Sequence, residues 1–355
     1  MKALILSGGK GTRLRPITHT GAKQLVPVAN KPILFYAIEA IRDAGITDIG
    51  IIVGDTHEEI RTAVGNGEKF GVKTTFIQQE APLGLAHAVK ISEDFMQGEP
   101  FVMFLGDNLI KDGITGFVEE YVKSGANSQI LLAHVPNPQS FGVAELDNTG
   151  RVIKLIEKPK DPPSDLALVG VYMFDSTVFK AVNAIKPSPR GELEITDAIQ
   201  YLIDTGYHVE SHIISGWWKD TGKLEDMLEA NRIVLDGLVT DINGEVTDNS
   251  EVMGRVSIGK GTKIINSCVR GPAIIGENCV IENAFVGPYT AINNGVKIIS
   301  SEIEHSIILE DCEILQIGSR IEDSLIGKNV RIEKDSKKPR AYRLMLGDNS
   351  AVSVI

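Results

Sequence analysis

The last third of the sequence repeats with a period of six residues. After about residue 245, aliphatic residues recur at every sixth position, for example at Val252, Ile258 and Ile264, and Ile-Gly or Val-Gly pairs mark the corners between runs. The period slips near residues 270, 285 and 303, which we attribute to irregular corners or insertions. Hexapeptide periodicity is typical of a parallel β-helix, in which each short strand stacks its aliphatic side chain on the coil beneath it. We therefore predict a β-helix over residues 241–335 and a tail over residues 336–355.

The sequence before residue 240 follows a different pattern. Short apolar runs, such as Ala3–Ser7 and Phe101–Gly106, alternate with amphipathic stretches of helical period, such as Ile33–Ala44 and Leu85–Phe95. Alternating strands and helices are typical of a mostly parallel sheet covered by helices on both faces. Ligands of such sheets bind at the carboxyl ends of the strands. We therefore predict one α/β domain over residues 1–240, with its functional site at that edge.

The first apolar run leads directly into a glycine-rich loop, Ser7–Leu14, that carries basic residues. Glycines allow successive backbone N–H groups to converge on the oxygens of a phosphate. The first 38 residues contain six Lys and Arg side chains and no carboxylate, although the whole chain has a formal net charge of −11. A basic segment on an acidic chain indicates a local site for a phosphate-rich small molecule and argues against a nucleic-acid partner.

The loop lacks the spacing of two common phosphate motifs. A dinucleotide-binding fingerprint requires a third glycine where this chain has Leu14. A Walker loop requires Ser or Thr directly after its lysine, whereas Gly11 follows Lys10 here. A tight turn without a ligand is the plain alternative, but it leaves the basic residues around the loop unexplained.

Two aspartates stand in polar turns beside apolar segments. Asp107 follows the apolar run Phe101–Leu105, and Asp220 lies in the segment Trp217–Gly222. One or two carboxylates together with substrate phosphates are the usual ligands of Mg²⁺. The alternative is that each aspartate only caps a turn, as Asp often does. No Ser-His-Asp or Cys-His arrangement stands out, so the pattern does not favour covalent catalysis.

The apolar runs, the cysteines and two histidines of the chain bear on its cellular location, on a membrane partner and on a zinc site. No apolar run reaches the length of a transmembrane helix, so we expect no membrane partner. Cys268, Cys279 and Cys312 lack metal-ligand spacing and are interpreted as reduced thiols of a cytoplasmic protein. His208 and His212 stand four apart, but in a stretch that alternates like a strand, which disfavours a zinc site.

Taken in order, the motifs of the chain resemble those of the sugar-nucleotide pyrophosphorylases, most closely the glucose-1-phosphate thymidylyltransferases. The resemblance covers residues 1–237 and is carried by Gly8–Leu14, Lys23-Gln24, Gly84–Ala86, Gly106–Asn108, Glu157–Pro159, Arg190–Asp197 and Asp220–Gly222. The hexapeptide region is similar to that of the long form, which ends in a left-handed β-helix. The resemblance implies a Rossmann-like nucleotidyltransferase fold and Mg²⁺-dependent formation of dTDP-glucose and pyrophosphate from dTTP and glucose-1-phosphate.

The resemblance also implies a role for each matching residue, with Arg13 at the β- and γ-phosphates and Lys23 at the α-phosphate. The residues implied for nucleotide binding are Gly8, Gly9, Gly11, Thr12, Arg13, Lys23, Gln24, Gln79, Gly84 and Asp107. Those implied for the sugar phosphate are Asn108, Gly142, Glu157, Lys158, Val169 and Arg190, and those implied for Mg²⁺ are Asp107 and Asp220. The implied catalytic set is Arg13, Lys23, Asp107, Lys158, Arg190 and Asp220.

In the resembled family, the residues that match Gln24 and Gln79 and the backbone that matches Gly84 recognise the pyrimidine base. The amide of glutamine can donate and accept hydrogen bonds along one edge, which matches the O and N–H groups of thymine or uracil. These bases differ by one methyl, worth roughly 1–3 kcal/mol of discrimination, so we expect dTTP to be preferred and UTP tolerated. A UTP-using glucose-1-phosphate uridylyltransferase stays an alternative. So does a catalytically silent regulatory or scaffold subunit, although such a subunit would be expected to have lost catalytic residues that are all present here.

Two residues depart from the resembled family, and both bear on the choice of sugar. Phe141 stands where short-form relatives have tyrosine, and Lys219 stands where they often have leucine. Which sugar phosphates are accepted is therefore left open. For the β-helix we expect a role in assembly, as a dimer, trimer or tetramer of identical chains. Acetyl transfer is the weaker alternative, because His305 is the only histidine after residue 245.

Overall fold

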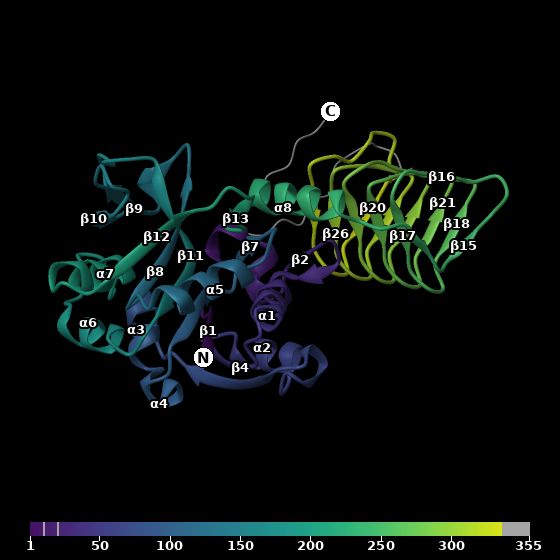
Figure 1. Ribbon diagram of the computed structural model, residues 1–355. Helices are drawn as coiled ribbons and strands as arrows, with labels where there is room; N and C mark the ends of the chain where they lie inside the picture. The colour runs from purple at the N-terminus through teal and green to yellow at the C-terminus, as the bar shows by residue number, and fades with distance from the viewer. Residues whose placement is uncertain (10, 20, 336–355) are drawn as a thin grey trace. The chain divides into compact units, whose positions relative to one another are not determined.

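The structure is a computed structural model that describes residues 1–9, 11–19 and 21–335 (Figure 1). The predicted tail, residues 336–355, lies outside the described residues. The chain divides into two compact units. The first unit comprises Met1–Lys10, Ala22–Leu25 and Ile33–Asp220, and the second comprises Gly11–Gly21, Val26–Pro32 and the chain from Thr221 onward.

In the part of the chain that the structure describes, the first unit is built around a nine-stranded sheet. Its strands are β1 Lys2–Ser7, β4 Asp48–Val53, β5 Lys73–Gln78, β6 Phe101–Leu105, β8 Ser128–His134, β9 Gly142–Leu146, β10 Val152–Glu157, β11 Leu166–Phe174 and β12 Val209–Ile213. The main order is β10-β9-β11-β6-β1-β4-β5, and β8 pairs with β11 and β12. β1 is parallel to β4 and β6, β4 is parallel to β5, and β11 joins β6 in antiparallel orientation.

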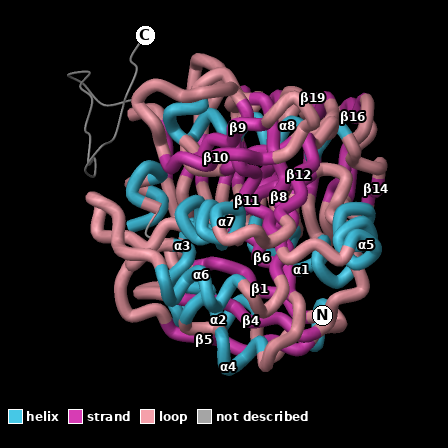
Figure 2. The backbone as a smooth tube through the Cα atoms, turned by 60° about the vertical axis from the view of Figure 1, so that its left-hand side comes forward, coloured by secondary structure: helices cyan, strands magenta, loops and turns pink. Residues whose placement is uncertain are grey.

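Helices cover both faces of this sheet. They are α1 Ile33–Asp43, α2 His57–Val64, α3 Leu85–Lys90, α4 Glu93–Met96, α5 Thr115–Ser124, α6 Val178–Ala184 and α7 Ile195–Asp204. Alternate residues of β1 enter two separate cores, with Ala3 and Ile5 in one and Leu4 and Leu6 in the other. The first core receives side chains from α1, α2 and α5, and the second from α3, α6 and α7. Figure 2 shows the helices around the strands of the sheet. The predicted Rossmann-like α/β fold is confirmed.

One predicted helix is divided in the structure. The stretch Leu85–Phe95 forms α3 and α4, with Ser92 buried between them. The Ser92 hydroxyl donates a 2.7 Å hydrogen bond to the carbonyl oxygen of Val89. A serine side chain that bonds locally to the backbone competes with helix continuation, which accounts for the break.

The second unit contains the predicted β-helix, whose strands form three parallel sheets (Figure 1). One sheet contains β14 Asp241–Ile242, β17 Val256–Ile258, β20 Ala273–Ile275, β23 Thr290–Ile292, β26 Ile307–Ile308 and β28 Leu325–Ile326. Another contains β15 Glu245–Val246, β18 Lys263–Ile265, β21 Val280–Glu282, β24 Lys297–Ile299, β27 Glu313–Leu315 and β29 Arg331–Glu333. The third contains β16 Glu251–Met253, β19 Cys268–Arg270, β22 Phe285–Val286 and β25 Glu302–Ile303.

Stacked aliphatic residues form the core of the β-helix. Ile258 pairs with Ile275, and Ile275 pairs with Ile292 in the next coil; all three side chains are buried. Several corners carry asparagine in the left-handed region, including Asn266 and Asn283 at φ 45° and 48°. Asparagine tolerates this region better than most residues, so the repeated corners can be tight without glycine. These features confirm the β-helix expected from the period of six.

A hairpin near the N-terminus belongs to the same unit as the β-helix. It is formed by β2 Pro27–Val28 and β3 Lys31–Pro32, and it lies beside α8 Leu224–Asp236. The side chain of Asn231 in α8 is fully buried. Its Oδ1 accepts from the backbone N–H of Ala29, and its Nδ2 donates to the carbonyl oxygen of Tyr289, both at 2.9 Å. One amide therefore connects the hairpin to a corner of the β-helix. None of the helices within residues 1–9, 11–19 and 21–335 has the length and apolar character needed to cross a bilayer.

Candidate active site

Lys23, Asp107 and Asp220 meet at one end of the sheet in the first unit. Two short strands, β7 Asn108–Ile110 and β13 Trp218–Asp220, pair in antiparallel orientation. This pairing places Asp220 opposite Asn108, the neighbour of Asp107, and so joins residues far apart in the sequence. The ammonium group of Lys23 donates a hydrogen bond to Oδ2 of Asp107 and lies 3.6 Å from Oδ1 of Asp220.

The charge of Lys23 controls the ionisation of Asp107. The Lys23 side chain is only 6% exposed, so its interaction with Asp107 is weakly screened by water. Burial by itself raises the pKa of the Asp107 carboxyl, but the charge and hydrogen bond of Lys23, helped by Asn108, lower that pKa below its usual value. Asp107 is therefore an ionised carboxylate at neutral pH.

The donor set of Asp107 and Asp220 fits Mg²⁺. This ion usually binds one or two protein carboxylates and takes its other ligands from phosphates and water. Within the described residues no cluster of three or more His, Cys, Asp or Glu side chains could hold a metal ion.

Asn108 is held in one orientation beside these carboxylates. Its Nδ2 donates to Oδ1 of Asp107 at 3.1 Å, and its Oδ1 accepts from the indole Nε1 of Trp218 at 2.6 Å. The indole N–H can only donate, so it fixes which end of the Asn108 amide faces Asp107. Trp218 is absent from the site residues predicted above. Its only sequence signal is the tryptophan pair that precedes Asp220.

Two side-chain amides lie next to the glycine-rich loop. Gln24 is 2% exposed, and its Oε1 has no hydrogen-bond partner among the described residues. A Cβ built on Gly9 would lie 3.5 Å from Nε2 of Gln24. Nε2 of Gln79 lies 3.2 Å from the carbonyl oxygen of Gly84 and 3.1 Å from Nδ1 of His87, a residue that the sequence analysis did not single out.

Two cations predicted for the sugar phosphate, Lys158 and Arg190, lie beside Glu157. Nζ of Lys158 and Nη2 of Arg190 lie 3.7 Å and 3.8 Å from Oε1 of this carboxylate. Arg190 also donates from Nε to Glu194 at 3.1 Å and from Nη2 to Glu192 at 2.8 Å. Burial alone lowers the pKa of Arg190, but the neighbouring carboxylates, Glu194 first, raise it. The structure thus groups both cations, with Arg190 paired to acidic side chains.

Glu157 occupies an unfavourable position for a charged carboxylate. Burial first and the charge of Glu194 second raise its pKa, despite the nearby cations. Gly142 lies opposite Glu157 in the β9–β10 pair, and a Cβ there would lie 2.7 Å from Cγ2 of Thr196. Val169 is fully buried in one of the two cores of the unit, so its side chain packs in that core.

The remaining loop residues lie in the second unit. Gly11 has a positive φ of 61°, and its carbonyl oxygen accepts a 2.7 Å hydrogen bond from the Thr18 hydroxyl. A short 3₁₀ helix, Thr12–Leu14, follows and carries Arg13. A Cβ built on Gly222 would lie 2.8 Å from Nη2 of Arg13, so the guanidinium packs against this glycine. The glycine that follows Asp220-Thr221 therefore makes room for Arg13.

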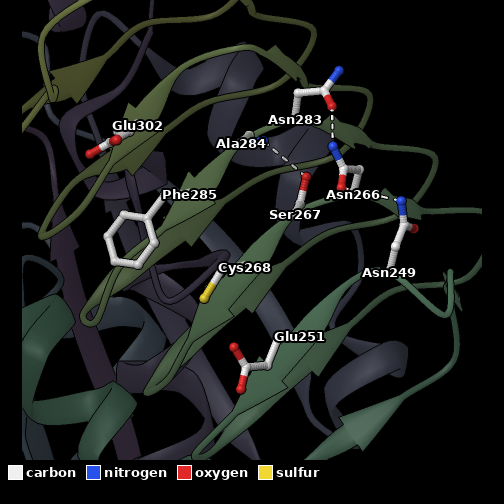
Figure 3. Close-up of a pocket in the computed structure, with 9 residues that line it drawn as sticks. All are labelled: Asn249, Glu251, Asn266, Ser267, Cys268, Asn283, Ala284, Phe285 and Glu302. Atoms are coloured by element: carbon white, nitrogen blue, oxygen red, sulfur yellow. Dashed lines mark hydrogen bonds between the residues drawn. The ribbon is translucent and has the colours of Figure 1, made fainter.

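A pocket of about 450 Å³ lies on the β-helix and contains none of the predicted site residues (Figure 3). Asn249, Asn266 and Asn283 form an amide ladder along it, with Nδ2–Oδ1 distances of 3.2 Å and 2.5 Å. Such ladders stabilise stacked strands, so a structural role accounts for these asparagines. The lining residues are Asn249, Glu251, Asn266, Ser267, Cys268, Asn283, Ala284, Phe285 and Glu302.

Comparisons with known proteins show the family to which the chain belongs. Residues 2–237 match the family model described as nucleotidyl transferase. The chain is 53% identical to a glucose-1-phosphate thymidylyltransferase of Streptomyces antibioticus, over 100% of this chain and 99% of that protein. It is 47% identical to the low-salt glycan biosynthesis nucleotidyltransferase Agl11 of Haloferax volcanii, over the full length of both. A solved UDP-glucose pyrophosphorylase in complex with UDP-glucose matches with a TM-score of 0.61 and 25% identity, over 66% of this chain and 98% of that chain.

Proposed function

Since the chain belongs to the nucleotidyl transferase family, we propose that it makes dTDP-glucose and pyrophosphate from dTTP and glucose-1-phosphate. Two full-length relatives, 53% and 52% identical, are named glucose-1-phosphate thymidylyltransferase, which supports this substrate pair. The observation that carries the proposal is the ammonium of Lys23 between Asp107 and Asp220. A cation flanked by two carboxylates suits a reaction between phosphate groups.

In the proposed reaction an oxygen of the sugar phosphate attacks the α-phosphorus of dTTP as the bond to pyrophosphate breaks. Asp107 and Asp220 would hold Mg²⁺, which supplies positive charge to the phosphates when bound. Lys23 stabilises the negative charge that develops at the α-phosphate, and Arg13 binds the departing phosphates. No covalent intermediate on the protein is needed, because positioning and charge neutralisation provide the rate enhancement.

Arg190 and Lys158 are proposed to bind the phosphate of glucose-1-phosphate. Arg190 already lies among Glu157, Glu192 and Glu194, so a phosphate that approaches it competes with these carboxylates. Arginine binds phosphate in a bidentate manner, which orients the attacking oxygen. Asn108, Glu157 and the backbone at Gly142 and Val169 are proposed to bind the hexose.

The second candidate function is a glucose-1-phosphate uridylyltransferase. The match to a solved UDP-glucose pyrophosphorylase supports it, as does the small difference of one methyl between the two bases. A silent scaffold subunit is a weaker candidate, because Arg13, Lys23, Asp107 and Asp220 are all present. We also propose that the enzyme is a cytoplasmic homo-oligomer, assembled through its β-helix, that acts on small molecules without a nucleic-acid or membrane partner.

Release of pyrophosphate from each nucleotide tests the proposal. The reaction contains Mg²⁺, glucose-1-phosphate and one of dTTP, UTP, GTP, ATP or CTP, with an EDTA control. We expect release that depends on Mg²⁺, with dTTP ahead of UTP and little activity with the others. UTP clearly ahead of dTTP would favour the uridylyltransferase, and no release with any nucleotide or sugar phosphate would favour the silent subunit.

A further inference from the structure

The orientation of the Gln79 side chain is fixed by its neighbours. Its Nε2 lies 3.2 Å from the carbonyl oxygen of Gly84 and 3.1 Å from Nδ1 of His87. A carbonyl oxygen only accepts hydrogen bonds, so the amide nitrogen of Gln79 must face Gly84. Turning the amide over would place two oxygen atoms against each other. The two N–H groups of Gln79 are thus directed at Gly84 and His87.

His87 can accept the second N–H in only one form. A neutral imidazole with its proton on Nε2 presents Nδ1 as an acceptor, whereas an imidazolium presents only donors. His87 is half-buried in α3. Burial first, and the charge of Lys90 second, lower the pKa of His87 below its usual value. The ring is therefore neutral at pH 7, and Nδ1 accepts from Gln79.

The other partner of Gln79 has little freedom to move. Gly84 has a φ of 101°, and a Cβ there would lie 2.7 Å from the backbone nitrogen of Leu193. Leu193 in turn donates to the carbonyl oxygen of Leu83 at 2.8 Å and accepts from the N–H of Ala86 at 3.0 Å. These backbone hydrogen bonds hold the Gly84 carbonyl group in place on the N-terminal side of α3.

The remaining polar atom of Gln79 is its oxygen. A Cβ built on Gly8 would lie 3.6 Å from Oε1 of Gln79, so this oxygen lies beside the glycine-rich loop. Because both N–H groups of the amide are engaged elsewhere, Gln79 offers a ligand an acceptor and no donor.

We propose that His87 is a positioning residue that sets the hydrogen-bonding character of the base site by keeping Gln79 an acceptor. This inference rests on the proposed function and on the base-binding role that the sequence resemblance implies for Gln79. Thymine and uracil carry an N–H group at N3, which can donate to such an acceptor. Cytosine carries a lone pair at N3, so two acceptors would face each other and CTP is rejected although its base has nearly the same size. His87 acts through Gln79 and does not have to touch the nucleotide.

Two variants with side chains of nearly equal shape test this inference. His87→Gln retains an oxygen that can accept from Gln79, whereas His87→Met offers only a weak sulfur acceptor. The measured quantity is the ratio of kcat/KM for dTTP to kcat/KM for CTP, with Tm as a check on folding. We expect His87→Gln to keep this ratio within about threefold of the starting protein. His87→Met should lower it by about tenfold or more, because the amide keeps only the restraint from Gly84 and turns more readily to offer an N–H to N3 of cytosine. A general structural defect would reduce both rates and leave the ratio unchanged.

The outcomes separate the inference from the proposed function. If the starting protein turns over dTTP and His87→Met has the same ratio of kcat/KM for dTTP to kcat/KM for CTP, the inference is wrong and the proposed function stands. If the starting protein turns over no nucleotide, the proposed function fails. The inference is then tested by binding, as the ratio of the dissociation constants for CTP and dTTP, which His87→Met should lower and His87→Gln should keep. Equal or absent binding of the two nucleotides would overturn it. The ¹⁵N spectrum of the histidines adds a direct check, since a protonated Nδ1 on His87 at pH 7.5 would also overturn it.

Discussion

The indole Nε1 of Trp218 donates a 2.6 Å hydrogen bond to Oδ1 of Asn108. This contact follows from the pairing of β13 with β7, and it leaves Nδ2 of Asn108 directed at Oδ1 of Asp107. Asn108 is 2% exposed, so its amide has few alternative partners. Trp218, which was not among the predicted site residues, therefore determines the orientation of the amide of Asn108, which was.

Replacing Trp218 by phenylalanine should weaken use of the sugar phosphate. Trp218→Phe keeps an aromatic ring next to Phe141, which lies 5.7 Å from Trp218 between ring centroids, but removes the donor to Asn108. We expect kcat/KM for glucose-1-phosphate to fall by about 10- to 100-fold, as is usual when a residue that orients a ligand group is lost. Steady-state kinetics with Trp217→Phe as the matched control checks this. Equal effects of the two substitutions would contradict a role for Trp218 in orienting Asn108.

Removing the charge of Asp107 should affect turnover and the requirement for Mg²⁺ together. Asp107→Asn keeps the shape of the side chain but removes an anionic oxygen that faces Lys23. We expect kcat to fall by at least about 100-fold and the Mg²⁺ concentration for half-maximal rate to rise. Asp94→Asn, at an exposed position of α4, is the control. Turnover of Asp107→Asn near the starting rate would show that Asp107 is not a metal ligand.

The raised pKa of Glu157 predicts a dependence of stability on pH. Because the folded-state pKa lies above the unfolded value, the folded protein binds more protons between the two values, and its stability falls as pH rises through that window. This loss of stability is complete once the pH exceeds the folded-state pKa of Glu157. Glu157→Gln removes this titration, so the variant should gain stability relative to the starting protein at pH 7.5 and show a smaller advantage at pH 4.

Urea unfolding at both pH values measures this difference for Glu157→Gln. The same variant should lose affinity for the sugar phosphate, because Glu157 is proposed to bind the hexose. A variant that is less stable at pH 7.5 would show that the ion pairs with Lys158 and Arg190 outweigh the cost of burying the Glu157 charge.

Asn231 should be among the residues most important for the stability of the second unit. Asn231→Ala leaves the N–H of Ala29 and the carbonyl oxygen of Tyr289, which are partly buried, without their partner. We expect the free energy of unfolding to fall by about 2–5 kcal/mol, since each unpaired buried group costs about 1–3 kcal/mol. Asn249→Ala, at the exposed end of the amide ladder, is the control and should cost less than about 1 kcal/mol. Comparable losses for both variants would argue against a special role for Asn231.

The β-helix could be predicted from sequence because its contacts repeat locally. Ile258, Ile275 and Ile292 stack because each coil advances by a nearly constant number of residues, and that constancy is visible as a period. The next stacked residues, Ile308 and Ile326, follow at unequal intervals, so the length of a coil is not strictly constant along the β-helix. The parallel strands of the first unit were also visible, because β1 and β6 are short apolar runs buried on both faces.

Contacts that depend on tertiary pairing could not be predicted. Nothing local to Trp218 indicates that it reaches Asn108, because the contact exists only through the register of β13 against β7. The same holds for His87 and Gln79, whose interaction depends on the direction in which α3 leaves its loop. The helix break at Ser92 was missed because the amphipathic period continues through it.

The central claim is that the sugar phosphate attacks the α-phosphorus of dTTP. Glucose-1-phosphate labelled with ¹⁸O at its three non-bridging phosphate oxygens tests it most directly. After turnover with dTTP and Mg²⁺, mass spectrometry measures the label in each product. The account predicts dTDP-glucose that carries all three labelled oxygens and pyrophosphate that carries none. Label in the pyrophosphate, or loss of a labelled oxygen from the sugar nucleotide, would contradict it.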